Sequence, residues 1–567
     1  MTELLIDGKR VSLPSDLSFD LIFENPYFTK SSTHTLDVDL PMPTNRHVFG
    51  MLHRMDVTKQ KVTLPAVLIA DGYQLLNGKA LVLGTTDQTV KIQLMSGNAE
   101  FNFLTNGDIY LDEVDWANDD YTYTNGYYLS YIKTEDVLSG PGYMDTGETI
   151  VYPDRQAVIP AEPVPYLTKL VRVIVEHFGF EMGTSYLDDT WMRHIFCVGG
   201  TTLERNSKWH YKSKIRCWGL MPHWTVKDFF SHLEEFAGVI MMIDDKTHQA
   251  MLIDMNTFFL ENSVQVDEVI DEYETDIESE NDAESNVTMG NTGYDLPSST
   301  NDGYNRLENR IVITAESKKA ADYNSLVQLW EKASEPVRLR TIYKTSGRSY
   351  ITKDGQFTEV DLYGNLIRDT ESTEVDNSLR FVPAAIVREQ VNLYKVGEGQ
   401  RIVKAGEFQV VVPVSYYDSS PIKNHITNIQ EVIEGNEQLT EKSSKDIMEL
   451  AVCPGMKSFA VGSYQLEIPA PFMDYTQKSV NQAGDNEMIS LSLHEVCEQS
   501  MGARHRSLMQ ISSAVTYKID FLLDSVPDVR KPFIIHCQKY FAKQIKVTVT
   551  ADGFGRLMQG EFYKIEI

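Results

Sequence analysis

The residues that could do chemistry in this chain form small, scattered groups. The sequence has no G-x-x-x-x-G-K-[ST] loop, no G-x-G-x-x-G turn after a strand, no H-E-x-x-H pair and no G-x-S-x-G turn. Those patterns place the phosphate-binding loops, zinc ligands and nucleophiles of nucleotide-binding proteins, zinc proteases and hydrolases. The sequence therefore predicts no catalytic residue and no cofactor, and we expect a protein that is not an enzyme.

Two His–Cys pairs have a spacing that metal ligands use. His494 and Cys497 form an H-x-x-C pair, and His536 and Cys537 are adjacent. Structural zinc takes four ligands, usually from two closely spaced pairs, and the sequence has no C-x-x-C to complete either pair. We expect ordinary half-buried side chains here and predict no metal.

An acidic alternation resembles the first ligands of a calcium loop. Asn281 and Val287 occupy the places where an EF-hand has its glycine and its last glutamate. A solvated acidic face is therefore the preferred interpretation, and a weak divalent-cation site is the alternative. The alternating residues are Asp276, Glu278, Glu280, Asp282 and Glu284.

Aromatic residues in the segment 112–142 offer an interface. The segment is rich in Asp, Asn, Tyr and Gly without a clean period, so we expect a long loop or a projecting extension. Tyrosine-rich loops supply contact area at a low cost in side-chain entropy. The interface candidates are Trp116, Tyr121, Tyr123, Tyr127 and Tyr128.

A basic island is the second interface candidate. Arg504 and Arg506 flank His505 in an otherwise acidic protein. The planar guanidinium group presents a fork of donors that fits a carboxylate or a phosphate. We interpret the pair as a salt bridge across a subunit interface, and a phosphate site or a plain exposed loop are the alternatives.

The charge of the chain limits its partners. Its 567 residues include 52 Lys and Arg against 81 Asp and Glu, a formal net charge of −29. Such a field repels phosphate backbones and anionic lipid surfaces, which argues against tight nucleic-acid binding and against a membrane partner. It suits a channel wall past which DNA slides without sticking, although ordinary solubility explains it equally well.

The sequence also predicts the compartment. No stretch approaches the roughly 18 consecutive apolar residues of a membrane span, and residues 1–10 lack the pattern of a signal peptide. The five cysteines are odd in number and widely spread, which favours free thiols over disulfides. We expect a protein that stays in the cytoplasm after synthesis.

The elements that would position these residues are mostly strands. Asp7-Gly8, between two short apolar runs, is the strongest hairpin signal. Thr44 is a plausible N-cap for one short helix over 44–56. Strands are expected over 17–23, 33–40 and 62–69, followed by a hairpin over 73–96 with Asn77-Gly78 as its hinge.

A compact α+β unit follows. A helix over 167–178 starts after two prolines and ends at a glycine. A second helix over 226–237 is capped by Thr225 and ended by Gly238, and a hairpin comes directly after it over 239–255. Its apolar stripe is interpreted as core.

The second half has weaker signals. Ten Asp or Glu residues lie between positions 267 and 284, which predicts an acidic linker or an exposed loop. Beyond it the apolar runs predict strands over 310–314, 337–343, 401–404, 407–414, 544–550 and 560–567.

Several of these segments together resemble a known family. The hairpin LIDGKRVSL over 5–13, the turn NPYF over 25–28 and a Thr-rich strand ending in Leu-Pro are similar to the start of phage and prophage tail proteins. The Phe178-Gly179-Phe180 helix end and LMPHWTVKDFF over 220–230 are similar to the same proteins. The likeness is to the tail hub or baseplate hub family, and it covers about the first half of the chain.

The resemblance implies a fold and a set of partners. It implies a virion structural protein at the tail tip, assembled in the cytoplasm of the bacterial host. There a homotrimer would present two tube-type β-barrel domains per subunit as a pseudo-sixfold ring. The implied partners are the tail tube or distal tail protein, the tape measure protein, spike or fibre proteins, and viral DNA that passes without specific binding.

Composition and resemblance together predict an α+β, β-rich, multidomain fold with tube-type β-barrel or sandwich domains and a small helix-hairpin α+β unit. The expected parts are an N-terminal β-barrel domain over 1–160, the α+β domain over 161–265, the acidic linker or exposed loop over 266–305, a second tube-like domain over 306–420 and a C-terminal β-rich domain over 421–567.

Two other functions stay open. A carbohydrate-recognising receptor-binding or distal tail protein would use the aromatic segment 116–128 on glycans. A tail-associated cell-wall hydrolase would need two carboxylates about 5–10 Å apart, and with 81 acidic residues the sequence cannot single out such a pair.

Overall fold

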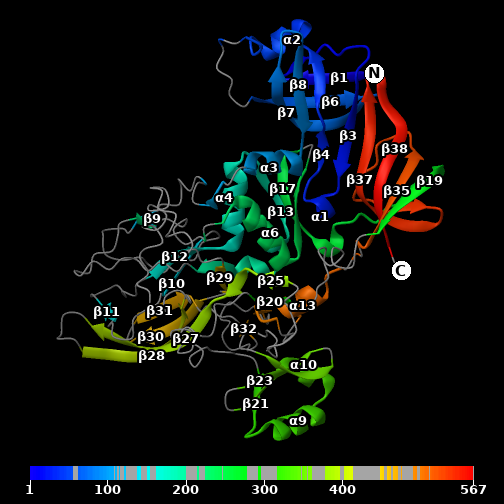
Figure 1. Cartoon of the computed structure of the whole chain (residues 1–567). Helices are drawn as coiled ribbons and strands as arrows, with labels where there is room; N and C mark the ends of the chain where they lie inside the picture. The colour runs from blue at the N-terminus through cyan, green and yellow to red at the C-terminus, as the bar shows by residue number, and fades with distance from the viewer. Residues whose placement is uncertain are drawn as a thin grey trace, which may run out of the picture.

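The computed structural model gives the fold of most of the chain. Figure 1 shows a large sheet that carries both termini, an α+β unit next to it, and a small separate unit that contains α9 (Tyr323–Lys332). The described residues are 1–54, 62–106, 161–198, 224–244, 247–277, 316–345, 348–353, 355–360, 377–395, 401–412, 447–452, 456–461, 464–469, 489–493, 498–509 and 513–565, with shorter pieces between them.

The large sheet contains strands from both ends of the chain (Figure 1). Its N-terminal strands are β1 (Thr2–Ile6), β2 (Lys9–Arg10), β3 (Ser18–Glu24), β4 (Thr33–Thr35), β5 (Val38–Pro41), β6 (Thr63–Ala70), β7 (Tyr73–Thr85) and β8 (Thr89–Met95). The later strands are β18 (Val264–Val266), β19 (Glu268–Ile277), β35 (Val515–Leu522), β36 (Phe533–Ile535), β37 (Gln538–Thr550) and β38 (Gly553–Lys564). The main path is β19-β35-β38-β37-β3-β4-β8-β7-β6-β1-β2.

The contact between β3 and β37 joins the two groups of strands. They pair antiparallel from Ser18 opposite Thr550 to Glu24 opposite Gln544. Val549 of β37 is buried in the same apolar cluster as Leu21 of β3, so the C-terminal segment supplies part of the N-terminal core. The expected domain boundaries stay predictions, but residues of the first and last expected domains share this sheet.

The predicted turns are right at one place and wrong at another. Asp7 and Gly8 both have positive φ, 51° and 68°, as a two-residue hairpin turn requires, and the Asp7-Gly8 hairpin is confirmed. Asn77-Gly78 is not a hinge, because both residues lie inside the continuous strand β7. The turn that precedes β7 is instead Asp71-Gly72, with φ of 52° and 83°.

Gly78 allows β7 and β8 to pack closely. A Cβ at this position would lie 2.1 Å from the carbonyl oxygen of Met95 in the neighbouring strand β8. The backbones of β7 and β8 lie too close together here for any side chain at position 78, so the position requires glycine for steric reasons. Its φ is not positive, so backbone conformation is not the reason.

The N-terminal helices differ from expectation. The helix expected over 44–56 is α2 (Met42–Phe49), which begins after Pro41 and not at Thr44, and which has Pro43 in its first turn. A one-turn helix, α1 (Pro26–Thr29), forms where only a break was expected, because the Asn25 side chain accepts from the Tyr27 N–H. The strand expected over 33–40 is divided into β4 and β5.

The two helices and the hairpin expected in the α+β unit are confirmed as α4, α6 and the β16–β17 pair, while its other elements were not expected. Its elements are α3 (Asn98–Thr105), α4 (Leu167–His177), β13 (Glu181–Ser185), α5 (Tyr186–Asp189), α6 (Val226–Ala237), β16 (Val239–Ile243) and β17 (Gln249–Asp254). The Thr225 hydroxyl accepts from the Asp228 N–H, and Gly238 ends α6 in the left-handed conformation, as the sequence predicts.

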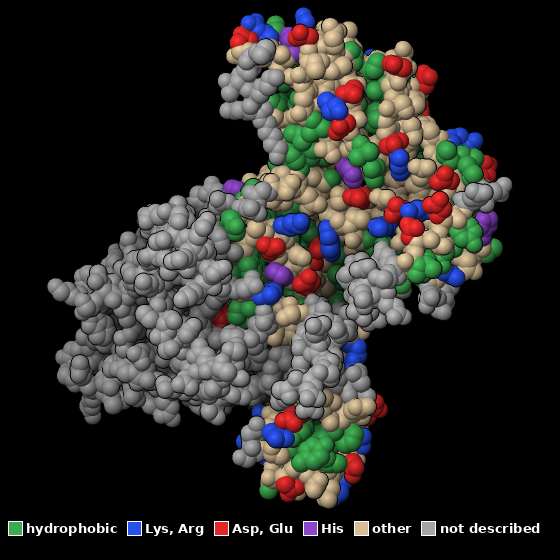
Figure 2. Space-filling model, viewed as in Figure 1, with side chains coloured by type: hydrophobic (Ala, Val, Ile, Leu, Met, Phe, Trp, Pro, Cys, Tyr) green, Lys and Arg blue, Asp and Glu red, His purple; other side chains and the backbone are tan. Residues whose placement is uncertain are grey.

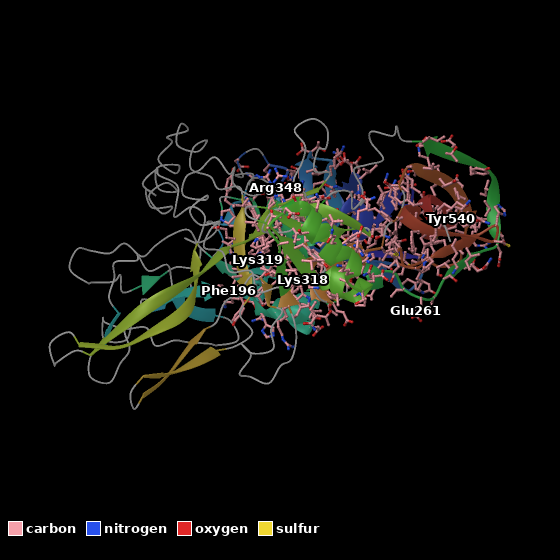
Figure 3. All side chains as sticks on the ribbon, turned by 90° about the horizontal axis from the view of Figure 1, so that it is seen from below. Phe196, Glu261, Lys318, Lys319, Arg348 and Tyr540 are labelled. Carbon is pink, nitrogen blue, oxygen red and sulfur yellow. The ribbon has the colours of Figure 1, made fainter. Side chains whose placement is uncertain are left out.

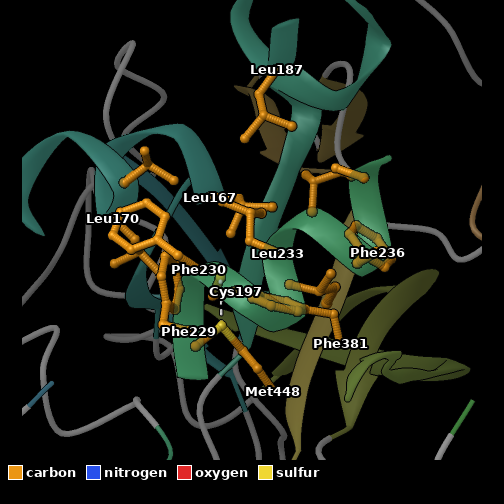
Figure 4. Close-up of a cluster of buried hydrophobic side chains, with 14 of the residues drawn as sticks. Leu167, Leu170, Leu187, Cys197, Phe229, Phe230, Leu233, Phe236, Phe381 and Met448 are labelled. Carbon is orange, nitrogen blue, oxygen red and sulfur yellow. Dashed lines mark hydrogen bonds between the residues drawn. The ribbon is translucent and has the colours of Figure 1, made fainter. Parts of the chain in front are cut away.

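The core of this unit lies between its helices and a small sheet formed by β14 (Ile195–Val198), β29 (Met448–Val452) and β26 (Phe381–Pro383). Figure 4 shows the α6 side chains Phe229, Phe230, Leu233 and Phe236 directed at this core. Phe381 packs against Phe229 and Phe236, and the Cys197 thiol lies 3.5 Å from the Met448 sulfur. The apolar stripe of α6 is therefore core, as expected.

A small unit over 316–360 stands apart from the rest (Figure 1). Its elements are β21 (Glu316–Lys319), α9, α10 (Glu335–Arg340), β22 (Thr341–Lys344), β23 (Ser349–Lys353) and β24 (Gln356–Val360). The strand expected over 337–343 is wrong in its first half, because α10 occupies it with Pro336 in the first turn. Figure 2 shows apolar side chains gathered on one face of this unit.

The remaining strands form short sheets. They are β9 (Tyr121–Thr122), β10 (Val137–Pro141), β11 (Ile150–Tyr152), β12 (Ala161–Pro165), β15 (Lys214–Ile215), β20 (Thr292–Tyr294), β25 (Asn377–Leu379), β27 (Ala385–Lys395), β28 (Arg401–Val412), β30 (Met456–Val461), β31 (Tyr464–Pro469), β32 (Asp474–Tyr475), β33 (Ile489–Ser490) and β34 (Gln499–Ser500). The α+β, β-rich, multidomain class is confirmed. Among the described strands, the large sheet follows an open path from β19 to β2 and does not close into the expected barrel.

Candidate functional site

The aromatic interface candidates fall largely outside the described residues. Trp116, Tyr123, Tyr127 and Tyr128 lie there, and Tyr121 is placed only as the first residue of β9, with its backbone opposite Ile215. The interface role of these five residues stays a prediction.

Arg504 has a defined place in α13 (Met501–Arg506), at the end of helix α6. Its guanidinium group donates to the carbonyl oxygens of Ala237, at 3.0 Å, and Gly238, at 2.7 Å. The same group forms an ion pair with Asp254 at 2.5 Å, and its side chain is only 7% exposed. Arg504 thus ties the end of α6 to the end of β17, and all these contacts lie within one chain.

The surroundings of Arg504 suit a buried cation. A helix C-terminus carries partial negative charge on its free carbonyl groups, which a guanidinium neutralises. The Tyr186 ring lies 4.5 Å beneath the guanidinium carbon, in cation–π geometry. Burial raises the pKa of the Tyr186 hydroxyl, against the opposing effect of the Arg504 charge. The predicted subunit-interface role of Arg504 and of the exposed Arg506 remains a prediction.

His505 is buried beside Arg504 and is held neutral. Its Nε2 lies 2.9 Å from the Phe236 carbonyl oxygen, so this nitrogen carries the hydrogen and donates. Burial lowers the pKa of the imidazole to about 4, and the Arg504 charge acts in the same direction. The imidazole therefore serves as a hydrogen-bond donor to the last turn of α6.

Glu234 connects α6 to the segment that follows α1. One carboxylate oxygen accepts from the Met241 N–H at 2.6 Å, and the other lies 2.6 Å from the Lys30 ammonium group. The Glu234 side chain is 6% exposed. A buried carboxylate in this position is stable because it is both paired and hydrogen-bonded.

Helix α3 makes a second connection of the same kind. Glu100 is buried and lies 3.3 Å from Lys79 of β7 and 3.9 Å from His248 in the β16–β17 turn. Burial raises its carboxyl pKa, while the charges of Lys79 and His248 oppose that rise. The neighbouring Asn98 donates to the Met241 carbonyl and accepts from the Ile243 N–H, both at 2.7 Å.

We call this set of contacts the junction: Lys30, Lys79, Asn98, Glu100, Glu234, Asp254, Arg504 and His505. Figure 1 shows why it matters, since α1 and α3 lie where the large sheet meets the α+β unit. Aromatic contacts extend the junction. Among them, the Phe259 ring stacks on the Phe541 ring with centroids 3.7 Å apart. In the junction, the Lys30–Glu234 and Lys79–Glu100 pairs connect the large sheet to the α+β unit, and Arg504 and His505 hold α13 against the end of α6.

Sequence reasoning missed most of the junction. Glu234 follows Phe230 by four residues and therefore lies on the apolar stripe of α6, which is a signal for a buried, paired carboxylate. Glu100 and Asn98 give no comparable signal, because their partners lie on β7 and β16, far away in the sequence.

The metal candidates have ordinary structural explanations where they are described. His536 and Cys537 both have positive φ, 48° and 61°, and form the tight turn between β36 and β37. Asp276 lies on β19 and pairs with Lys518 at 2.5 Å. His494, Cys497 and residues 278–284 lie outside the described residues. In the described part of the chain, no three His, Cys, Asp or Glu side chains gather as a metal site would require.

Comparisons with known proteins add the following. No protein-family model matches the chain and no curated protein matches it. The solved structures with some similarity include a 43 kDa tail protein of prophage MuSo2 from Shewanella oneidensis, with 8% identity, TM-score 0.31 and coverage of 99% of this chain and 96% of that one. A tail protein from Neisseria meningitidis MC58 has 6% identity, TM-score 0.31 and coverage of 100% and 96%.

A third structure is prophage tail protein gp18 from Listeria monocytogenes EGD-e, with 8% identity, TM-score 0.22 and coverage of 76% of this chain and 99% of that one. Each of the three is described as a tail protein. In the part of the chain that the structure describes, no helix has the length and apolar character to cross a bilayer.

Proposed function

We propose that this chain is a structural protein of a phage-type tail, a hub or tail-tip adaptor that works through assembly and catalyses no reaction. The sequence support is the resemblance of residues 5–41 and 220–230 to tail hub proteins. The structural observation that carries the proposal is the pair of Lys30–Glu234 and Lys79–Glu100 contacts in the junction, which hold the α+β unit against a sheet built from both ends of the chain.

The junction suits a protein whose function depends on a fixed orientation between its units. Buried ion pairs add little net stability, but they penalise every arrangement in which one partner is left alone. Glu234 pairs with Lys30 and Glu100 with Lys79, so a shift between the sheet and the α+β unit would leave these buried carboxylates unpaired. An adaptor between a tube and a host-recognition apparatus needs such a fixed angle between its units.

The proposed assembly is a homotrimeric ring at the tail tip. It would contact the tail tube or distal tail protein and the tape measure protein on one side, and spike or fibre proteins on the other. Its bore would admit viral DNA, and the net charge of −29 favours passage without retention.

Negative-stain imaging of the purified full-length chain tests the proposal. Rings with a threefold or sixfold outline are expected, and a population of monomers at every concentration would overturn the assembly. Zymography on purified cell wall provides the separate test of the non-enzymatic part, for which no cleared band is expected. A cleared band that one point substitution removes would favour a wall hydrolase.

A further inference from the structure

Strand β19 is an open edge of the large sheet. It pairs with β35, and among the described residues no strand pairs with its other side. Figure 1 shows β19 at the margin of the molecule, away from the α+β unit. An open edge presents N–H and C=O groups that can pair with an added strand, and natural proteins often block such edges with lysine or proline. The β19 sequence EVIDEYETDI contains neither.

One face of β19 is apolar and exposed. After an irregularity between Val269 and Tyr273, the strand pairs regularly with β35 up to Ile277 opposite Val515. Because side chains alternate along a strand, Tyr273, Thr275 and Ile277 share one face. Tyr273 is 65% and Ile277 77% exposed, although both continue a row that starts at the buried Ile519.

This row lies next to an existing aromatic contact. The ring of Tyr517, which is opposite Thr275, packs edge-on against the ring of Tyr540 at 5.5 Å between centroids. Figure 3 labels Tyr540 in this end of the sheet. An added strand would cover Tyr273 and Ile277 and extend this apolar cluster by one strand.

The opposite face of β19 is acidic. Glu274 and Asp276 alternate with the apolar row and are exposed, and Lys518 of β35 already pairs with Asp276. The ten residues of β19 include five Asp or Glu and no Lys, Arg or His. Figure 2 shows acidic, basic and apolar side chains close together on the corresponding margin of the molecule.

From this edge we propose that β19 is the docking site for an extended segment of a partner protein that alternates basic and apolar residues. Its Lys or Arg side chains would lie opposite Glu274 and Asp276, and its apolar side chains would cover Tyr273 and Ile277, by strand addition. A second copy of β19 is disfavoured, because it would place carboxylates opposite carboxylates. The basic edge strand β2 spans only two residues and its Arg10 is paired with Glu3.

The test uses the full-length chain and a fluorescent ten-residue peptide of alternating Lys and Val, with an alternating Glu–Val peptide as the probe control. Binding is followed by fluorescence anisotropy, and hydrogen exchange of residues 273–277 is followed in the same mixture. We expect the Lys–Val peptide alone to bind and to slow that exchange. Glu274→Lys should weaken its affinity by about tenfold, because attraction across the strands becomes repulsion.

Glu261→Lys is the matched control, because this substitution changes the charge by the same amount as Glu274→Lys. Glu261 is exposed and precedes β19 in the chain (Figure 3). Its affinity should stay within about twofold of the parent, because a distant exposed charge is screened. Equal weakening by both variants would mean general attraction to an acidic protein and would overturn the proposal. Absence of binding by the Lys–Val peptide would also overturn the proposal. Self-association of the parent chain that the double variant Tyr273→Lys, Ile277→Lys abolishes would overturn it as well.

Discussion

Arg504 is the single residue on which the most contacts of the junction converge. It neutralises the end of α6, pairs with Asp254 and covers the Tyr186 ring. Its substitution therefore removes several buried contacts at once.

Arg504→Met should therefore destabilise the protein strongly. The substitution keeps most of the side-chain volume but removes the positive charge paired with Asp254 and the donors to the Ala237 and Gly238 carbonyl oxygens, so we expect a loss of about 3 kcal/mol in the free energy of unfolding. Urea unfolding measures it. Arg506→Met is the control, expected within about 0.5 kcal/mol because Arg506 is exposed. Equal losses for both variants would contradict the assigned role.

His505 makes stability depend on pH. Its pKa is about 4 when folded and near its ordinary 6.5 when unfolded, so between these values the unfolded chain binds the proton more readily. Stability from this group is complete above pH 6.5 and decreases as the pH falls toward 4, by on the order of 3 kcal/mol in total.

Urea unfolding of the parent and of His505→Gln at pH 7.5, 5.5 and 4.5 measures this contribution. Glutamine keeps a donor for the Phe236 carbonyl but does not titrate, so the variant should lose less stability on acidification. Parallel pH profiles for the two proteins would mean that His505 does not contribute.

At the scale of elements, helix α6 shows which parts a sequence can predict. Its start at Thr225, its end at Gly238 and its apolar stripe all follow from neighbours within a few residues, and all are confirmed. The Asn77-Gly78 hinge is wrong for the opposite reason. The Asn-Gly pair is a local turn signal, but Gly78 is present for a non-local reason. It lies against the Met95 carbonyl of β8, where only glycine fits.

Gly78→Ala should thus disturb the sheet, while Gly84→Ala should not. Both residues lie in β7, but a Cβ meets the Met95 oxygen at 2.1 Å in the first case and nothing within 4 Å in the second. We expect a loss of about 2–3 kcal/mol for Gly78→Ala from overpacking against backbone. Thermal or urea unfolding compares the two variants, and equal stabilities would refute this explanation.

The connection between α6 and the sheet side can be tested with adjacent residues. Glu234→Ala removes the acceptor of the Met241 N–H and the partner of Lys30, so we expect a loss of about 2–3 kcal/mol. Glu235→Ala removes an exposed carboxylate beside His232 and should cost less than about 0.5 kcal/mol. Equal losses of unfolding free energy for the two variants in urea would mean that Glu234 contributes no more to stability than an exposed carboxylate.

At the scale of the whole molecule, the sequence predicts the class but not the connections. Local alternation predicted β3 and β37 separately, yet nothing in either strand specifies a partner 528 positions away, as Asp20 and Thr548 are. Strands with one apolar face are interchangeable in pattern, so their pairing depends on the complete set of elements. The junction was missed for the same reason, because its ion pairs join segments distant in sequence.

A chain truncated after residue 512 should fail to form the N-terminal sheet. It lacks β37, which pairs along the full length of β3 and buries Val549 in the N-terminal cluster. We expect rapid proteolysis of residues 1–95 and no cooperative unfolding transition by circular dichroism, in contrast to the full-length chain. A protease-resistant N-terminal fragment would show that β37 is dispensable there.

The pairing of β3 with β37 has a consequence for biosynthesis. At roughly 5–20 residues per second, a ribosome reaches the last strands roughly half a minute to two minutes after it has made β3. During that interval β3 has no final neighbour on one side, and a prematurely terminated product never acquires one. A polypeptide that ends before β37 therefore cannot present a complete sheet, which would keep such defective translation products out of any larger particle.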